Sequence, residues 1–161
     1  MQKNKAIFLD RDGVINVERG YTSKLEDFVI LPDLIEVLQI LKQRGYLLIV
    51  VSNQSGIAKG LYTQNDVEVL HHFLINELSK NNVVLDEIYY CVHHSDEGLC
   101  ICRKPDSLFV EKAIARFDIE PSKSYFIGDK ERDVQAGEKA GVKGILIEAN
   151  ISLKNILHII D

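Results

Sequence analysis

Two stretches of the chain decide its fold class: KAIFLDRDG, residues 5–13, and YLLIVVSNQSG, residues 46–56. Each begins as a continuous apolar run and changes abruptly to polar residues. Short continuous apolar runs are typical of strands that are buried on both faces of a parallel sheet. We therefore expect strands over Lys5–Leu9 and Tyr46–Val51, each followed by a polar segment.

Helical and strand patterns alternate through the rest of the chain. The helices are indicated by apolar residues at helical spacing, by proline near the first turn and by glycine after the last. Such alternation predicts a three-layer, Rossmann-like α/β domain with a mainly parallel sheet, formed by the whole chain, residues 1–161. The expected helices are Pro32–Gly45, a segment after Thr63, Pro105–Phe117, a short segment ending near Ala140 and Ile151–Ile160, and the further strands are Ile88–Val92, Ser124–Ile127 and Gly144–Ile147.

Composition and charge exclude several classes of protein. The 161 residues are 46% hydrophobic and 27% charged, which is ordinary globular usage. A net charge of −5 without a run of lysine and arginine disfavours a nucleic-acid partner. The longest apolar run, Tyr46–Val51, is far shorter than the ~20 residues of a membrane-spanning helix, and the N-terminus carries no signal-peptide core. We expect a cytoplasmic monomer without a membrane partner.

Polar or reactive side chains follow four of the expected strands. Asp10, Ser52, Cys91 and Asp129 each stand at or just beyond the carboxyl end of one strand. In open α/β sheets, ligands bind at the carboxyl ends of the strands. We therefore expect these four positions to converge on one edge of the sheet and to form the functional site there.

Asp10 and Asp12 flank Arg11 directly after the first strand and precede Gly13. Two carboxylates at this spacing can act on one reacting centre, one as a nucleophile and the other by exchanging a proton with the leaving group. Aspartate and glycine are also common in solvated turns. On its own, this motif leaves both interpretations open.

A second acidic motif, Gly128–Asp129, follows a later strand, and Asp133 comes four residues after Asp129. Carboxylate oxygens from Asp10 and Asp129 are the hard ligands that Mg²⁺ prefers, together with substrate phosphate and water. Asp129 could instead simply cap the following helix. The pair of acidic motifs therefore indicates a magnesium site only when both strand ends are considered together.

Donors for a phosphoryl group stand at two further positions. Ser52 and Asn53 follow the second strand, and Arg103 and Lys104 come just before Pro105. Hydroxyl, amide and cationic groups of this kind stabilise the oxygens of a phosphoryl group. For the basic pair, a solvated surface position is the alternative interpretation. The polar residues at the other strand ends favour the phosphate-binding role.

Taken in order, these motifs resemble the haloacid dehalogenase superfamily of aspartate-nucleophile phosphotransferases. The superfamily pattern is a DxD after the first strand, Ser or Thr after the second, Lys before a later helix and GDxxxD after the fourth. The resemblance covers nearly the whole chain and implies the fold expected above. The sequence holds no large cap insertion, so we expect an open site whose selectivity comes from the loops Glu18–Phe28 and 91–102. The matching positions are Asp10, Asp12, Ser52, Lys104, Asp129 and Asp133.

Within the superfamily, five segments resemble the D-glycero-D-manno-heptose-1,7-bisphosphate 7-phosphatases. This resemblance implies a Mg²⁺-dependent phosphatase acting on a phosphorylated sugar, in the synthesis of activated heptose for surface polysaccharide. Histidinol-phosphate phosphatases share much of the pattern, so that activity, or another small phosphomonoesterase, is the alternative. A zinc-stabilised binding module with an inactive site is a third interpretation. The segments are FLDRDGVINVERGY, VVSNQSGIAKG, YYCVHH, CRKP and IGDKERD.

The resemblance also implies a role for each matching residue. Asp10 is implied as the nucleophile and Asp12 as the general acid and base. Mg²⁺ is implied to bind Asp10, the backbone carbonyl of Asp12 and Asp129. Ser52, Arg103 and Lys104 are implied to stabilise the phosphoryl group. The substrate contacts implied are Glu18, Arg19, Gly20, Tyr21, Ser52, Asn53, Gln54, Ser55, Arg103, Lys104 and Lys130.

The cysteines form a separate motif within residues 91–102. An odd number of cysteines crowded into one loop is no disulfide framework, and three thiols with an imidazole suit a closed tetrahedral Zn²⁺ site. By composition, either His93 or His94 could be the fourth ligand. Three buried free thiols are the alternative, although a polar loop with a glycine is a poor place to bury cysteine.

The C-x-H…C-x-C pattern of the resembling family selects the ligands Cys91, His93, Cys100 and Cys102. A site with four protein ligands has no open position, so the zinc is expected to be structural. Bound there, it would fasten the loop Ser95–Ile101.

Overall fold

The structure of the protein is a computed structural model that describes residues 3–161. Its centre is a five-stranded sheet with the strand order β3-β2-β1-β4-β5, and all four neighbouring pairs in the described chain are parallel. A parallel sheet with crossover helices is what the alternating pattern predicted. The strands are β1 (Lys5–Leu9), β2 (Tyr46–Asn53), β3 (Glu87–Cys91), β4 (Tyr125–Gly128) and β5 (Lys143–Leu146).

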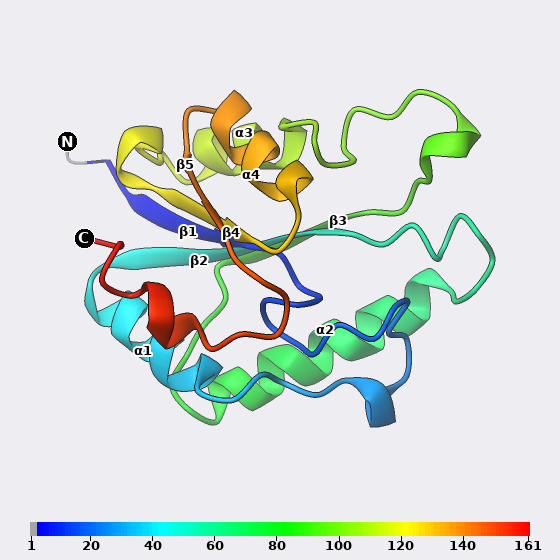
Figure 1. Ribbon diagram of the computed structural model, residues 1–161, viewed down its shortest axis with the longest axis horizontal. Helices are drawn as coiled ribbons and strands as arrows, with labels where there is room; N and C mark the ends of the chain where they lie inside the picture. The colour runs from blue at the N-terminus through cyan, green and yellow to red at the C-terminus, as the bar shows by residue number, and fades with distance from the viewer. Residues whose placement is uncertain (1–2) are drawn as a thin grey trace.

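Helices cover both faces of this sheet. In Figure 1, α1 and α2 lie on one face, and α3 and α4 lie on the other. None of the helices in residues 3–161 is long and apolar enough to cross a membrane. The four α-helices are α1 (Leu34–Gln43), α2 (Gln64–Ser79), α3 (Leu108–Arg116) and α4 (Glu131–Lys139), and the short 3-10 helices are η1 (Leu25–Asp27), η2 (Ser95–Glu97), η3 (Pro121–Lys123) and η4 (Leu153–Ile156).

Two hydrophobic cores, one on each face, hold the three layers together. The apolar stripe of α2 is fully buried against the sheet, with Leu70, Leu74 and Leu78 at 0% exposure. Burying one such leucine stabilises the fold by about 1.5–3 kcal/mol. The helix begins directly after Thr63, as predicted, and Thr63 and Asp66 form a capping box at its start.

The polar strand ends meet at one edge of the sheet, as predicted. Leu9 is in register with Val50 of β2, and Asn53 is in register with Cys91 of β3. The C-terminus lies at the opposite edge, near the start of β2 (Figure 1). The described chain forms only η1 and two isolated β-bridges between β1 and α1, and only η2 between β3 and α3, so the edge carries no cap domain.

The predicted helix Ile151–Ile160 is wrong. Only the short 3-10 helix Leu153–Ile156 forms there. Arg44 donates through Nη1 to the backbone oxygens of Leu157 (3.1 Å) and Ile160 (2.6 Å). These tertiary hydrogen bonds satisfy carbonyls at the end of the segment without a helical ladder.

The third helix begins at Leu108, three residues later than its proline suggested. The side chain of Asn53 accounts for the delay. Its amide accepts from the backbone nitrogen of Lys104 (3.0 Å) and donates to the backbone oxygen of the same residue (3.1 Å). This pairing commits the backbone at Lys104 to the end of β2 before the helix can start.

Candidate active site

Lys104 is the buried centre of the polar cluster at the sheet edge. Its Nζ lies 2.8 Å from Asp10 Oδ1, 2.7 Å from Asp133 Oδ1 and 2.7 Å from the backbone oxygen of Val51. The contacts to Asp10 and Val51 are hydrogen bonds, and the contact to Asp133 is an ion pair. Burial alone would lower the pKa of Lys104, but the charges of Asp10 and Asp133 raise it above its ordinary value. The lysine therefore stays charged and links the two acidic motifs.

Asp10 follows β1 and lines the pocket at this edge. Its Oδ1 accepts from the backbone nitrogen of Arg11 (2.8 Å) and from Lys104. Within the described chain, Oδ2 takes part in no such hydrogen bond, so it is the oxygen left for chemistry. Burial raises the pKa of Asp10, and the charge of Lys104 opposes that shift.

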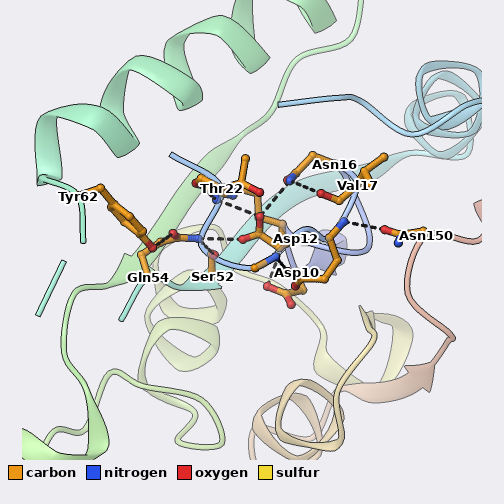
Figure 2. Close-up of polar contacts among 12 residues, drawn as sticks. Asp10, Asp12, Asn16, Val17, Thr22, Ser52, Gln54, Tyr62 and Asn150 are labelled. Carbon is orange, nitrogen blue, oxygen red and sulfur yellow. Dashed lines mark hydrogen bonds and ion pairs between the residues drawn. The ribbon is translucent and has the colours of Figure 1, made fainter. Parts of the chain in front are cut away.

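Asp12 is surrounded by donors (Figure 2). Its Oδ1 accepts from Arg11 Nη2 (3.0 Å) and from Asn16 Nδ2 (2.9 Å), and its Oδ2 accepts from Gln54 Nε2 (3.1 Å). Burial alone would raise the pKa of Asp12, but the charge of Arg11 and these hydrogen bonds lower it. Asp12 is therefore ionised in the free protein. The hydrogen bonds from three side chains fix the orientation of its carboxylate.

Asp129 follows β4 and differs from its acidic neighbours in having few partners. Its Oδ1 is buried and forms no hydrogen bond to the described residues, and its Oδ2 has the ion pair to Lys130 Nζ at 3.0 Å. Burial raises the pKa of Asp129, and Lys130 opposes that shift. Gly13, at φ +86°, approaches so closely that a Cβ there would lie 2.7 Å from Asp129 Oδ2.

The acidic cluster fits a divalent cation. Oxygens of Asp10, Asp129 and Asp133 all lie within 4.8 Å of one another. Asp133, however, is committed: its Oδ1 pairs with Lys104, and its Oδ2 accepts from the backbone nitrogen of Lys130 (3.0 Å) at the start of α4. Asp10 and Asp129 retain oxygens without hydrogen-bonding partners, and buried oxygens of this kind suit Mg²⁺.

A pocket of about 250 Å³ opens over this cluster. Most of the predicted substrate contacts line it. Ser52 and Lys104 are buried, and Arg19 is exposed and outside the lining. The predicted residues in the lining are Asp10, Asp12, Glu18, Gly20, Tyr21, Asn53, Gln54, Ser55, Arg103, Asp129 and Lys130.

Three lining residues escaped the sequence analysis: Tyr62, His94 and Arg132. Arg132 could have been found, because it follows GDKE at the start of α4 and so stands beside the acidic motif. Tyr62 lies in a loop between β2 and α2, where neither periodicity nor a strand end marks it. The sequence marks His94 only as a candidate metal ligand.

The thiols and one imidazole gather beyond β3. All six pairwise distances among the sulfurs of Cys91, Cys100 and Cys102 and Nδ1 of His93 are between 2.9 and 3.5 Å. His94 lies outside this group and pairs with Asp96 at 3.2 Å. The geometry thus groups the four residues that the family pattern selected, and their donor set suits a tetrahedral metal ion.

Comparison with known proteins decides the family. The signature of the haloacid dehalogenase-like hydrolases matches residues 5–141. The chain belongs to this family. It is 42% identical over 145 residues to the D-glycero-beta-D-manno-heptose-1,7-bisphosphate 7-phosphatase of Haemophilus influenzae, covering 87% of this chain and 79% of that protein. It is 43% identical over 148 residues to the corresponding alpha-anomer phosphatase of Campylobacter jejuni, covering 92% and 84%.

A solved structure of this hydrolase family extends the likeness to the fold. The D,D-heptose 1,7-bisphosphate phosphatase of B. bronchiseptica, in complex with magnesium and phosphate, superposes with a TM-score of 0.84. The two chains are 30% identical, and the match covers 96% of this chain and 86% of that one. The α/β fold with a parallel sheet and no cap, predicted from the strand pattern and the resemblance, is confirmed.

Proposed function

We propose that the protein is a Mg²⁺-dependent phosphatase that removes the 7-phosphate of D-glycero-D-manno-heptose 1,7-bisphosphate. It would serve the synthesis of nucleotide-activated heptose for surface polysaccharide, as a monomer of one domain in the cytoplasm. The observation that carries the proposal is the buried triad of Lys104, Asp10 and Asp133, which stands beside Asp12 under one pocket. The relatives' names supply the substrate.

In the first half-reaction, Asp10 attacks phosphorus in line through Oδ2 and forms an aspartyl-phosphate. The bond from phosphorus to the sugar oxygen breaks, and Asp12 gives its proton to that oxygen. An incoming phosphate disfavours negative charge on Asp12, so it raises the affinity of this carboxylate for the proton that it must carry. Lys104 holds Asp10 Oδ1 and thereby fixes the direction of attack.

In the second half-reaction, Asp12 accepts a proton from water, and the water oxygen attacks the phosphorus of the intermediate. The bond between phosphorus and Asp10 breaks, which restores the free carboxylate and releases inorganic phosphate. One pair of carboxylates therefore serves both halves, with Asp12 as acid in the first and base in the second.

Mg²⁺ would be held by Asp10, the backbone carbonyl of Asp12 and Asp129. Bound there, it offsets the repulsion between a carboxylate nucleophile and an anionic phosphate. Ser52, Arg103 and Lys104 are proposed to stabilise the phosphoryl oxygens. The unpartnered oxygens of Asp129 support this assignment.

We also propose that Cys91, His93, Cys100 and Cys102 bind one structural Zn²⁺. Four ligands close the coordination shell, so no position is left for substrate or water. Arg103 follows the last ligand, and its Nη1 donates to the backbone oxygen of His93 (3.3 Å), so the metal would hold Arg103 at the pocket. Elemental analysis of metal-replete protein should give one zinc per chain.

Charge at the pocket supports a substrate with two phosphates. The lining holds Arg103, Lys130 and Arg132, of which only Lys130 has an ion pair among the described residues, so two guanidinium groups remain for phosphate oxygens. Glu18 and Tyr21, which line the same pocket, can contact sugar hydroxyls. Binding of remote phosphate and hydroxyl groups accelerates the reaction when it orients the reacting group.

The test is a comparison of kcat/KM values at equal Mg²⁺. Both anomers of heptose 1,7-bisphosphate, fructose 1,6-bisphosphate and histidinol phosphate would be the substrates. We expect a preference for one heptose anomer of at least about tenfold, which is roughly 1.4 kcal/mol of transition-state binding. A tenfold preference for histidinol phosphate would assign that activity instead. If no phosphate ester is hydrolysed, the interpretation that remains is the inactive, zinc-stabilised binding module.

A further inference from the structure

We propose that Tyr62 and Gln54 are positioning residues that aim the reactive oxygen of Asp12. The proposal rests on the role of Asp12 as acid and base in the proposed function. It gives Gln54 a different task from the substrate contact that the family resemblance implies, and it brings in Tyr62, which no motif marked. Figure 2 shows the chain of contacts from Tyr62 through Gln54 to Asp12.

The two oxygens of Asp12 are not equivalent. Oδ1 accepts two hydrogen bonds, from Arg11 and Asn16. Among the described residues, Oδ2 accepts only one, from Gln54 Nε2 at 3.1 Å. Since a carboxylate oxygen has about two strong acceptor sites, Oδ2 is the one that retains a site for a proton. The direction of that remaining site is fixed by the hydrogen bond from Gln54.

The orientation of the Gln54 amide is fully determined. Its Nε2 donates to Asp12 Oδ2 and to Ser52 Oγ (2.7 Å), so both of its hydrogens are used. A carboxylate can only accept from the amide, so the nitrogen must face Asp12 and the oxygen must face Tyr62. Tyr62 therefore donates through its hydroxyl to Gln54 Oε1, at 2.8 Å. With an exposure of 2%, Gln54 is built into the wall of the pocket.

Tyr62 is itself fixed by the loop after β2. A Cβ on Gly56 would lie 2.2 Å from Cε1 of the Tyr62 ring, so the ring packs directly on the glycine backbone. The backbone nitrogen of Leu61 donates to the backbone oxygen of Gly56 (2.9 Å) and closes the turn that places the ring. Burial raises the pKa of Tyr62, so its hydroxyl remains a donor throughout the working pH range.

The first test is Tyr62→Phe, which removes the hydroxyl and keeps the ring. For heptose bisphosphate, we expect kcat to fall about tenfold, or roughly 1.4 kcal/mol, at unchanged KM. The same variant should lose less than about twofold in kcat/KM on p-nitrophenyl phosphate, because its leaving group departs without a proton from Asp12. A structural defect would lower the activity toward both substrates equally, and that result would overturn the proposal.

Further variants distinguish a relay, in which Tyr62 acts on Asp12 through Gln54, from a direct contact of Gln54 with the substrate. Gln54→Met should show the same split between the two substrates, and adding Tyr62→Phe to it should lower kcat no further, because Tyr62 acts through Gln54. Gly56→Ala should reproduce the split by displacing the ring. A rise in KM at unchanged kcat for Gln54→Met, or additive losses in the double variant, would refute the relay.

Tyr46→Phe is the matched control. Its hydroxyl is also hydrogen-bonded, to the backbone oxygen of Asp161 (2.9 Å), at the start of β2 and far from the pocket. We expect wild-type kinetics from this variant. If the wild-type protein prefers another sugar phosphate, the comparison uses that substrate, so failure of the heptose assignment is distinguishable from failure of the relay.

Discussion

Two candidate metal regions lie beyond the same sheet edge, and they are held in different ways. The carboxylate centre is buried, and Lys104, Arg11 and Gln54 assign most of its oxygens to protein donors. The cysteine loop has only the short η2 as regular structure, and Leu99 at its tip is fully exposed. The first region is therefore held by contacts within the protein, whereas we expect the second to depend on a bound metal ion.

Electrostatics supports the same contrast. In the carboxylate centre, the charge of Lys104 compensates Asp10 and Asp133. In the loop, three sulfurs lie 2.9–3.5 Å apart, and no cationic side chain among the described residues is paired with them. Thiolates this close would repel one another unless a cation lay between them. Loss of Mg²⁺ should therefore affect turnover, and loss of zinc should affect structure.

The largest effect is expected from Asp10→Asn. Turnover should fall by more than about a thousandfold, because an amide cannot form the acyl phosphate. Lys104 keeps its ion pair to Asp133 and its hydrogen bond to the Val51 carbonyl, so the fold and the zinc content should not change. Steady-state kinetics, the melting temperature and elemental analysis measure these three properties. Near-normal phosphate release would rule out covalent catalysis at Asp10.

Cys100→Ser should act first on zinc content and stability, and on activity only indirectly. With a weaker ligand, the zinc content should fall below one per chain and the melting temperature should drop. Protease should then cut within Ser95–Ile101, and activity should fall because Arg103 loses its anchor at His93. The control is a weak chelator of Mg²⁺, which should stop activity reversibly while zinc and the melting temperature stay constant. A variant with full zinc content would argue against this ligand set.

The same contrast explains how far the sequence could predict the molecule. Asp10, Ser52 and Asp129 could be placed because each follows a buried apolar run, and parallel strands bring their carboxyl ends to one edge. Cys91 and the other thiols could be grouped by spacing alone.

What the sequence could not supply are contacts between segments with no local signal. The end of the chain lacks its predicted helix because Arg44 binds its carbonyls. The delayed start of α3 comes from Asn53, 51 residues from its partner Lys104. Tyr62 enters the pocket from a loop whose path depends on packing against Gly56.

A smaller effect is expected from Arg132→Gln, which tests whether this lining residue of the pocket binds the remote phosphate. Arg132 lines the pocket beside Lys130, and no ion pair to it is found within residues 3–161. If it binds the remote phosphate, KM for the bisphosphate should rise about tenfold, while KM for heptose 7-phosphate changes less than about twofold. Arg116→Gln, on the exposed side of α3, is the matched control. Equal changes for both substrates would exclude a role in binding the second phosphate.

The smallest effect concerns His71, which is buried on α2. Burial, followed by the charge of Arg11, lowers the pKa of His71 to about 3, and its Nε2 has no partner among the described residues. Between that value and the ordinary pKa of about 6.5, the unfolded chain binds a proton that the folded chain does not. The free energy of unfolding should therefore fall as pH drops below 6.5, by up to about 1.4 kcal/mol per pH unit.

His71→Leu isolates this contribution, because all other titrating groups are shared with the wild-type protein. Denaturant unfolding at a series of pH values from 7.5 to about 5 should give a steeper loss of stability for the wild type than for the variant. Zinc content is checked at each pH, since protonation of the metal ligands lowers metal affinity as well. Parallel curves would mean that His71 ionises freely in the folded protein. That result would contradict the burial of His71, which is only 4% exposed, as the cause of its lowered pKa.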